Sequence, residues 1–205
     1  VTLVYSAALR QMETKMQILN DEFQHVHQYN PIEHIKARIK TPESIVKKLK
    51  RYGQESTIEN MVNYINDIAG IRIICSFTSD IYRIADMIRD QRDIKVIAVK
   101  DYITYPKASG YKSYHMIVSI PVYLSDRTVD TKVEVQIRTV AMDFWASLEH
   151  KIHYKFEGDA PENIKNELVE CARMVSDLDA RMLSLNEEIL AISKKREEEQ
   201  KQKNI

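Results

Sequence analysis

The chain has 205 residues, balances 30 Lys and Arg against 30 Asp and Glu, and is 44% hydrophobic. This length is ample for one domain with a sizeable core, and a formal net charge of +0 excludes the bulk attraction behind nonspecific binding to nucleic acids or membranes. No apolar run approaches the ~20 residues that a membrane span requires. The sequence therefore predicts a soluble, cytoplasmic protein that binds neither membrane nor DNA.

Cysteine and glycine usage excludes several kinds of site. Cys75 and Cys171 lie far apart and form no disulfide framework or zinc pattern, so we expect both to be buried thiols. The chain has 4 glycines, and none has the spacing of a Walker phosphate loop or a Rossmann turn. If the protein binds nucleotides, side chains rather than a glycine-rich loop must hold the phosphates.

Helical patterns occupy most of the first third of the chain. Apolar residues spaced alternately by three and four positions predict an N-terminal helix over residues 1–28. Thr41 as N-cap and Pro42 in the first turn predict a second helix, which ends at Gly53. A short helix is expected from about Thr57.

The pattern changes from helical to strand-like after Asp67. We expect strands over 71–77, 95–102, 114–124 and 131–138, a helix over 80–91 and another helix from Ala141. The last two strands form a hairpin around residues 125–126. The predicted fold class is α+β, with a mixed sheet of four to five strands flanked by helices. We expect a single domain over 1–205 with its core at about 31–154.

The C-terminal part of the chain carries a seven-residue apolar repeat. The repeat runs from Ile164 to Ile192 and predicts one long helix over 160–203. Two arrangements fit this pattern: the helix packs along its own domain, or its apolar seam forms a contact between subunits. The charged end, 194–203, is expected to be solvated.

Polar residues alternate with aliphatic ones in the last predicted strand. In 133–138, strand alternation sends the aliphatic side chains to one face and Glu134, Gln136 and Arg138 to the other. The exposed face of an edge strand would explain this pattern. Because the segment leads directly into a Trp-containing helix, an interior strand is the alternative that we favour. A carboxylate there needs a cation or a functional reason.

A second carboxylate, Asp67, precedes the first predicted strand. A turn or helix-cap role would also explain Asp67. If Asp67 and Glu134 lie on neighbouring strand ends, they provide the minimal oxygen set for a Mg²⁺ ion completed by phosphates and water. Basic residues crowd the adjoining segments, which favours a phosphate-bearing ligand.

The loop 106–115 combines cations, aromatic residues and a flexible joint at Gly110. Such a loop is suited to stacking a base on Tyr111 while Lys and His side chains reach phosphates. Basic loop residues are more often simply solvated, so the loop taken alone is a weak signal.

Several motifs stand in the order found in a known family. They are Asp67-Ile68-Ala69-Gly70-Ile71-Arg72, Asp101-Tyr102-Ile103 with Pro106-Lys107, Ser109-Gly110-Tyr111-Lys112-Ser113-Tyr114-His115, and Glu134-Val135-Gln136-Ile137-Arg138-Thr139. With these motifs, residues 31–154 resemble the synthetase domain of the RelA/SpoT homologues. The size and flanking helices resemble the small alarmone synthetases of the RelP/RelQ type. Glu13 and Gln17, in place of basic residues on the first helix, favour the RelP branch.

The resemblance implies a nucleotidyltransferase-like fold and a GTP pyrophosphokinase (GTP diphosphokinase) activity. In this reaction pyrophosphate passes from ATP to the 3′-hydroxyl of GTP or GDP, and the products are AMP and the stringent-response alarmones pppGpp or ppGpp. Family members of this size are typically homotetramers, which suits subunit contacts through the terminal helices. The chain has no His-Asp dipeptide and no room for the hydrolase and regulatory domains of long relatives. We therefore expect synthesis without hydrolysis.

The resemblance also implies roles for individual residues. Asp67 and Glu134 are the expected Mg²⁺ ligands and catalytic residues, with Glu134 also accepting the 3′-hydroxyl proton. Arg38 and Arg72 resemble a pair that clamps adenine, Tyr111 stacks on guanine, and Asp143 reads the guanine edge. The residues expected to bind ATP are Arg38, Lys40, Ser44, Lys48, Arg51 and Arg72. The residues expected to bind GTP are Lys107, Tyr111, Lys112, His115, Gln136 and Asp143.

Two other functions remain open from the sequence. A catalytically silent relative would hold nucleotide or RNA and act through its oligomer, although it would have no need to keep Asp67 and Glu134. A different nucleotidyltransferase would use the same scaffold for another acceptor, and the pair of Tyr111 and Asp143 argues against that function.

Overall fold

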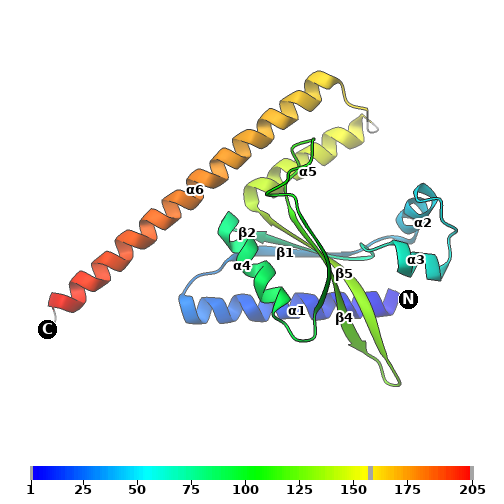
Figure 1. Cartoon of the computed structure of the whole chain (residues 1–205), viewed down its shortest axis with the longest axis horizontal. Coiled ribbons are helices and arrows are strands. Elements are labelled where there is room, and N and C mark those ends of the chain that lie inside the picture. Colours follow the sequence, from blue (N-terminus) through cyan, green and yellow to red (C-terminus); the bar gives the residue numbers. More distant parts are fainter. Residues whose placement is uncertain (1, 157–158, 204–205) are drawn as a thin grey trace.

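The computed structural model describes residues 2–156 and 159–203, in which one twisted sheet is surrounded by helices (Figure 1). The elements in chain order are α1 (Thr2–His27), β1 (Ile32–Ile39), α2 (Pro42–Arg51), α3 (Ile58–Tyr64), β2 (Ala69–Cys75), α4 (Thr78–Arg89), β3 (Lys95–Asp101), β4 (Tyr114–Tyr123), β5 (Thr128–Thr139), α5 (Val140–Lys155) and α6 (Glu162–Lys203). Val1, included in the expected N-terminal helix, lies outside the described residues.

The sheet has five strands in the order β1-β2-β5-β4-β3. Strands β2 and β5 run parallel, and the other neighbouring pairs are antiparallel. The expected mixed α+β fold is therefore confirmed. The last strand along the chain, β5, lies in the middle of the sheet. This position confirms that Glu134, Gln136 and Arg138 belong to an interior strand.

Strand β1 was not among the strands that the sequence predicts. Its pairing with β2 is irregular between Ile32 and His34, so the apolar residues do not alternate strictly along it. Strand β1 also lies at an edge of the sheet, where most of its side chains stay partly or fully exposed. Because its alternation is weak, this strand could not be predicted from the sequence pattern, although it contributes to the main cavity.

One face of the sheet forms the hydrophobic core. Val133, Val135 and Ile137 of β5 are fully buried against α1 and α4. Met12 and Met16 on α1 are also fully buried, and Figure 1 shows α1 running along this face of the sheet. Because alternate strand residues point to opposite faces, the same alternation leaves the polar residues of β5 on the face away from this core.

The helix that follows β1 begins and ends as its sequence indicates. The Thr41 side chain accepts a hydrogen bond from the backbone N–H of Ser44, and Pro42 occupies the first turn of α2. Gly53 follows with φ +68, a left-handed conformation that ends the helix at low cost because glycine has no Cβ. These local signals fix where the lysines of α2 lie relative to the sheet.

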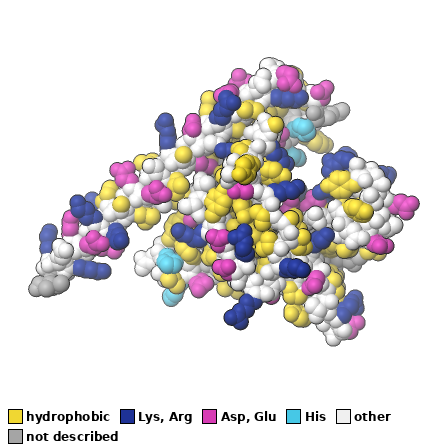
Figure 2. Space-filling model, in the orientation of Figure 1, with side chains coloured by type: hydrophobic (Ala, Val, Ile, Leu, Met, Phe, Trp, Pro, Cys, Tyr) yellow, Lys and Arg dark blue, Asp and Glu magenta, His cyan; other side chains and the backbone are white. Residues whose placement is uncertain are grey.

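The long helix α6 divides into two parts with different surroundings. Leu168 and Val175 pack against a small cluster of Trp145, Ala146 and Ala172. Farther along the helix, Leu178, Met182 and Leu185 are about half exposed, at 51%, 46% and 52%. This second part projects beyond the sheet, and hydrophobic side chains lie among charged ones along it (Figures 1 and 2).

The two cysteines differ in burial. Cys75 is buried in β2, as expected, but Cys171 is exposed, so that part of the prediction is wrong. The apolar repeat includes Cys171, but the side of α6 that packs against α5 carries Leu168, Ala172 and Val175 and leaves Cys171 exposed. Among the described residues, no helix is both long enough and apolar enough to cross a membrane.

Candidate functional site

The polar face of the sheet is assembled by strand register. Arg38 on β1 is paired with Gly70 on β2, and Gly70 is paired with Glu134 on β5. Arg72 is paired with Gln136 in the same way. These side chains share one face and line a cavity of about 360 Å³, together with Asp67 and Lys36. Glycine at position 70 leaves the floor of this cavity open between the arginine and the glutamate.

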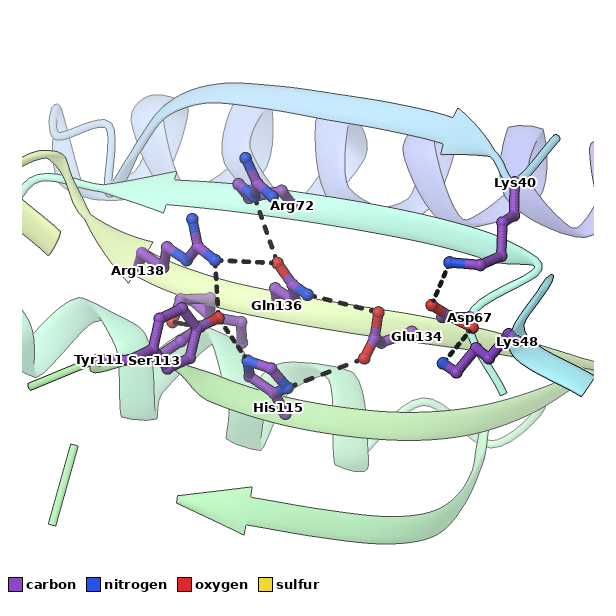
Figure 3. Close-up of polar contacts among 11 residues, drawn as sticks. Lys40, Lys48, Asp67, Arg72, Tyr111, Ser113, His115, Glu134, Gln136 and Arg138 are labelled. Atoms are coloured by element: carbon purple, nitrogen blue, oxygen red, sulfur yellow. Dashed lines mark hydrogen bonds and ion pairs between the residues drawn. The ribbon is translucent and has the colours of Figure 1, made fainter. Parts of the chain in front are cut away.

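At one end of this face lies a group of three charged residues, called here the Asp67 cluster. Lys40 Nζ is 2.8 Å from Oδ2 of Asp67, and Lys48 Nζ is 2.8 Å from Oδ1 (Figure 3). Burial alone would raise the pKa of Asp67, but hydrogen bonds and charge from the two lysines outweigh it and lower the pKa below its usual value. Asp67 is therefore an ionised carboxylate that faces two cations.

Glu134 lies in the middle of the polar face. Its Oε2 accepts a hydrogen bond from Gln136 Nε2 at 3.4 Å, and its Oε1 is 3.8 Å from Nδ1 of His115 (Figure 3). Burial raises the pKa of Glu134, and the negative charge of Asp67 raises it further. A carboxylate in this setting is a better proton acceptor than an ordinary surface glutamate.

At the other end lies a network called here the Arg138 cluster, made of Tyr111, Gln136, Arg138 and Asp143. Arg138 Nη2 donates to the Tyr111 hydroxyl at 2.7 Å and to Gln136 Oε1 at 3.3 Å. Its Nη1 donates to Asp143 Oδ1 at 3.1 Å. The guanidinium carbon also lies 5.2 Å from the centre of the Tyr111 ring. One arginine thus connects a loop, the central strand and the first turn of α5.

His115 joins the two ends of the site. Its Nε2 is 2.9 Å from the Tyr111 hydroxyl. Burial, with the positive charges of Arg138 and Lys107, lowers the pKa of His115 to about 3. The ring is therefore neutral near pH 7, and Nε2 is free to accept the hydroxyl proton of Tyr111 while that oxygen accepts from Arg138.

Helix α6 supports the loop that carries Tyr111. Gly110 has φ +93, and a Cβ at this position would come within 2.6 Å of the Ala172 Cβ. Nearby, Trp145 Nε1 donates to the backbone oxygen of Leu168 at 2.8 Å. Only a residue without a side chain permits both this backbone conformation and this close approach.

Comparison with known proteins identifies the family. The family model described as the region found in RelA and SpoT proteins matches residues 37–159. The chain belongs to the RelA/SpoT family. It is 49% identical over 187 residues to the GTP pyrophosphokinase YwaC of Bacillus subtilis, which covers 91% of this chain and 89% of the relative. The GTP pyrophosphokinase YjbM of the same organism is 34% identical and covers 90% and 86%.

Solved structures within this family have the same fold. The small alarmone synthetase 2 from Bacillus subtilis matches with a TM-score of 0.83 at 46% identity and covers 91% of this chain and 97% of the other. The small alarmone synthetase 1 from the same organism, bound to its product pppGpp, has a TM-score of 0.83 at 33% identity, with coverage of 91% and 94%. The resemblance of this chain to the small alarmone synthetases is thereby confirmed.

Most of the residues that the family motifs indicate lie together. Arg38, Asp67, Arg72, Glu134 and Gln136 line the main cavity. Other indicated residues do not line the cavity but contact one another in the Asp67 cluster, in the Arg138 cluster or around the Tyr111 ring. They are Lys40, Lys48, Lys107, Tyr111, His115 and Asp143.

Three indicated residues lie apart from the main cavity. The Ser44 hydroxyl bonds to Thr41 in the first turn of α2, and Arg51 lies over the Tyr52 ring at the end of that helix. The Lys112 ammonium donates to the Ser176 hydroxyl on α6, where Lys112 lines a second cavity. In this conformation Ser44 and Arg51 contact the ends of their own helix, and Lys112 contacts α6, rather than the cavity.

Two cations of the polar face, Lys36 and Arg138, had no role assigned from the sequence. Lys36 lines the cavity from β1, but the strand itself went unrecognised. Arg138 was placed on the correct face of β5, yet its role as the centre of the network was missed. An arginine in an interior strand requires buried partners, and this requirement was the available signal.

Proposed function

We infer that this chain is a GTP pyrophosphokinase, which transfers pyrophosphate from ATP to the 3′-hydroxyl of GTP or GDP and releases AMP with pppGpp or ppGpp. The observation that carries the inference is Glu134, a partly buried carboxylate with a raised pKa that shares one cavity with Asp67 and a pair of arginines. The names of the relatives and the bound product of one structural neighbour support the same reaction. Hydrolysis of the product is not part of the proposed activity.

ATP is assigned to the Asp67 end of the face. Arg38 and Arg72 lie on adjacent strands, and their planar guanidinium groups suit the two faces of an adenine ring. Lys40 and Lys48 are assigned to the phosphates because both ammonium groups already face a carboxylate that phosphates can replace. Ser44 and Arg51 extend this assignment along α2 and require a movement of that helix towards the cavity.

The guanine nucleotide is assigned to the Arg138 end. Tyr111 provides a ring for stacking, and Asp143 provides a carboxylate that pairs with the N1–H and amino group of guanine. Lys107, which lies 4.9 Å from the Tyr111 ring centre, is assigned to phosphates together with Lys112. His115 is neutral and contributes a hydrogen bond rather than a charge, while Gln136 orients the acceptor from the central strand.

Mg²⁺ fits the donor groups that this face offers. Mg²⁺ favours one or two carboxylates completed by substrate phosphates and water, and Asp67 with Glu134 provides two carboxylates beside a phosphate site. No group of three or more His, Cys, Asp or Glu suited to a metal occurs among the described residues, so nucleotide phosphates must complete the shell. When bound, the ion offsets phosphate charge and aligns the reacting oxygens.

The chemistry centres on Glu134. The 3′-oxygen of the guanine nucleotide forms a bond to the β-phosphorus of ATP, while the bond from that phosphorus to the α-phosphate oxygen breaks and AMP leaves. The carboxylate of Glu134 takes the proton of the 3′-hydroxyl. Burial and the Asp67 charge keep its proton affinity high, and a hydrogen bond from Gln136 orients one of its oxygens.

Assembly and location extend this proposal. The half-exposed apolar seam of α6 from Leu178 to Ile192 suits contact with further copies of the chain, and we assign a homotetramer in the cytoplasm. Light scattering of the purified protein measures the number of copies directly, and a monomer at micromolar concentration contradicts this assignment.

Product analysis tests the function. Purified protein is incubated with ATP, Mg²⁺ and either GTP or GDP, and the nucleotides are separated by anion-exchange chromatography. We expect AMP in equal amount to a guanosine penta- or tetraphosphate. The absence of AMP, with nucleotide binding retained, would instead identify a catalytically silent member of the family.

A further inference from the structure

Arg138 is the most deeply buried cation of the polar face. The residue is 4% exposed, although arginine is rarely buried unless it is fully paired. Its Nε is the one buried side-chain nitrogen or oxygen without a hydrogen-bond partner among the described residues. Burial of an incompletely paired charge is costly, so the position calls for an explanation beyond the stability of the fold.

The contacts of Arg138 reach side chains from three separate elements. Its two terminal nitrogens hold Tyr111 in the loop, Gln136 on β5 and Asp143 on α5, at 2.7, 3.3 and 3.1 Å. A lysine offers a point charge and cannot span these acceptors in one plane. The three contacts therefore depend on the planar, forked shape of the arginine guanidinium group.

The contacts also constrain Tyr111 in a way that packing alone does not. The Tyr111 hydroxyl accepts from Arg138 and lies 2.9 Å from His115 Nε2, so both sides of this oxygen are engaged (Figure 3). The ring is thereby fixed at its outer end as well as at its backbone. A fixed ring loses less conformational entropy when a base stacks on it.

The contact with Asp143 has a similar effect on a second side chain. Both Arg138 and Arg72 approach Oδ1 of Asp143, at 3.1 and 3.6 Å. With Oδ1 engaged by two guanidinium groups, the carboxylate is held in one rotamer. The two groups proposed to contact guanine are thus oriented by one arginine that need not touch the nucleotide.

We propose that Arg138 is a positioning residue for the guanine nucleotide, which preorders the Tyr111 ring and the Asp143 carboxylate through its guanidinium fork. This inference rests on the proposed function for the identity of the base. It predicts that loss of the fork weakens binding of the guanine nucleotide and leaves binding of the adenine nucleotide nearly unchanged.

The test measures binding first and turnover second. Isothermal calorimetry gives Kd for GDP and for a non-hydrolysable ATP analogue, in wild type and in Arg138→Lys. We expect a rise in the GDP Kd of about 10- to 100-fold, the range by which small misplacements in active sites reduce function. The Kd for the ATP analogue should change by less than about twofold, within the reach of ordinary surface substitutions.

A matched control is available on α4. Arg89 also contacts a tyrosine hydroxyl and a carboxylate, with Nη2 3.3 Å from Tyr114 and Nη1 2.7 Å from Asp86, but it lies outside the site. Arg89→Lys should leave both Kd values unchanged. Circular dichroism and thermal melting of both variants report whether the fold is retained.

A double-mutant cycle separates positioning from general damage. Tyr111→Phe keeps the ring and removes the hydroxyl, so it removes the atom through which Arg138 acts on the ring. If the inference holds, Arg138→Lys has a much smaller effect on the GDP Kd in the Tyr111→Phe background than in wild type. Fully additive effects, or equal weakening of both nucleotides, would overturn the inference.

The two proposals fail in different ways. If wild type binds GDP but makes no alarmone, the proposed reaction is wrong, and the GDP Kd of Arg138→Lys still decides the positioning role. If wild type makes alarmone and Arg138→Lys binds GDP normally, only the positioning role is wrong. If wild type binds no guanine nucleotide at all, both are wrong.

Discussion

The two ends of the polar face are built by different means. The Asp67 cluster consists of two lysines on long side chains that face one carboxylate, and all three side chains remain 15–20% exposed. The Arg138 cluster is centred on a planar cation that is itself buried, and its loop is pressed against α6. A lysine–aspartate ion pair can be exchanged for a pair with phosphate, whereas the Arg138 guanidinium already engages three acceptors of the protein itself. The first end therefore adapts to its ligand, and the second is preordered for its ligand.

The largest effect is expected where the two ends meet. Glu134→Gln removes the proposed proton acceptor and one proposed metal ligand while keeping the shape of the side chain. Turnover should fall by about 100- to 10,000-fold, the range that general base catalysis supplies, as measured by AMP release. Asp93→Asn, which alters an exposed carboxylate paired with Lys15, is the control and should retain activity. Retained turnover in Glu134→Gln would overturn the assigned role.

Tyr111→Ala tests the preordered end. Removal of the ring should cost about 1–3 kcal/mol in binding of the guanine nucleotide, the typical value for a stacked base. Binding of the ATP analogue should stay nearly constant, because the Asp67 cluster is formed by other elements. Calorimetry measures both affinities, and Tyr123→Ala, at a tyrosine that is 75% exposed on the hairpin, is the control. Equal losses for both nucleotides would contradict a division between the two ends.

Gly110→Ala tests the support that α6 gives to the loop. Gly110 and Gly53 both have positive φ, but a Cβ at Gly53 meets nothing within 4 Å, whereas one at Gly110 collides with Ala172. Each substitution should lower the free energy of unfolding by about 1–2 kcal/mol because of backbone strain, as measured by chemical denaturation. Only Gly110→Ala should also weaken GDP binding. A similar loss of GDP affinity in Gly53→Ala would show that strain rather than the α6 contact is responsible.

The smallest effect concerns proton affinity. The charge of Asp67 raises the pKa of Glu134, so Asp67→Asn should lower the pKa of Glu134 towards its ordinary value of 4.5. A raised carboxyl pKa means that the surroundings destabilise the charged form. With one of these causes removed, Glu134 in the variant should stay ionised down to a lower pH than in wild type. Carboxyl-detected NMR titration of the nucleotide-free and metal-free protein measures this shift. An unchanged or higher pKa would mean that Asp67 and Glu134 do not interact.

His115 provides an internal reference in the same titration. Its pKa is lowered to about 3, so the ring should show no protonation step between pH 5 and 8 in wild type or Asp67→Asn. A step near the ordinary value of 6.5 would mean that the ring is less buried and less surrounded by cations than described.

Local features of the site were predictable from the sequence, and long-range ones were not. Alternation in β5 placed Glu134, Gln136 and Arg138 on one face, and the Thr41-Pro42 pair located α2 correctly. The partner of Lys112 is Ser176, 64 positions away, and no local pattern indicates such a contact. The family motif assigns Lys112 to the nucleotide, and the contact of its ammonium with α6 became visible only in the structure.

Two errors have a physical origin of the same kind. Strand β1 was missed because its irregular pairing breaks the alternation that identifies strands. Cys171 was expected to be buried because the heptad pattern was equated with burial, although a pattern shows only which side of a helix is apolar. Whether that side is covered depends on neighbours that the periodicity does not describe.

The central position of β5 has a consequence for the order of folding. The strand that carries Glu134 is the last of the five to be synthesised, yet it inserts between β2 and β4. The pair Arg72 and Gln136 is separated by 64 positions, so its formation closes a long loop, which makes it slow relative to helices and hairpins. During translation, a nascent chain that ends before β5 lacks Glu134 and Gln136, which line the main cavity, and Arg138, the centre of its own cluster. The polar face is therefore complete only after this strand has left the ribosome.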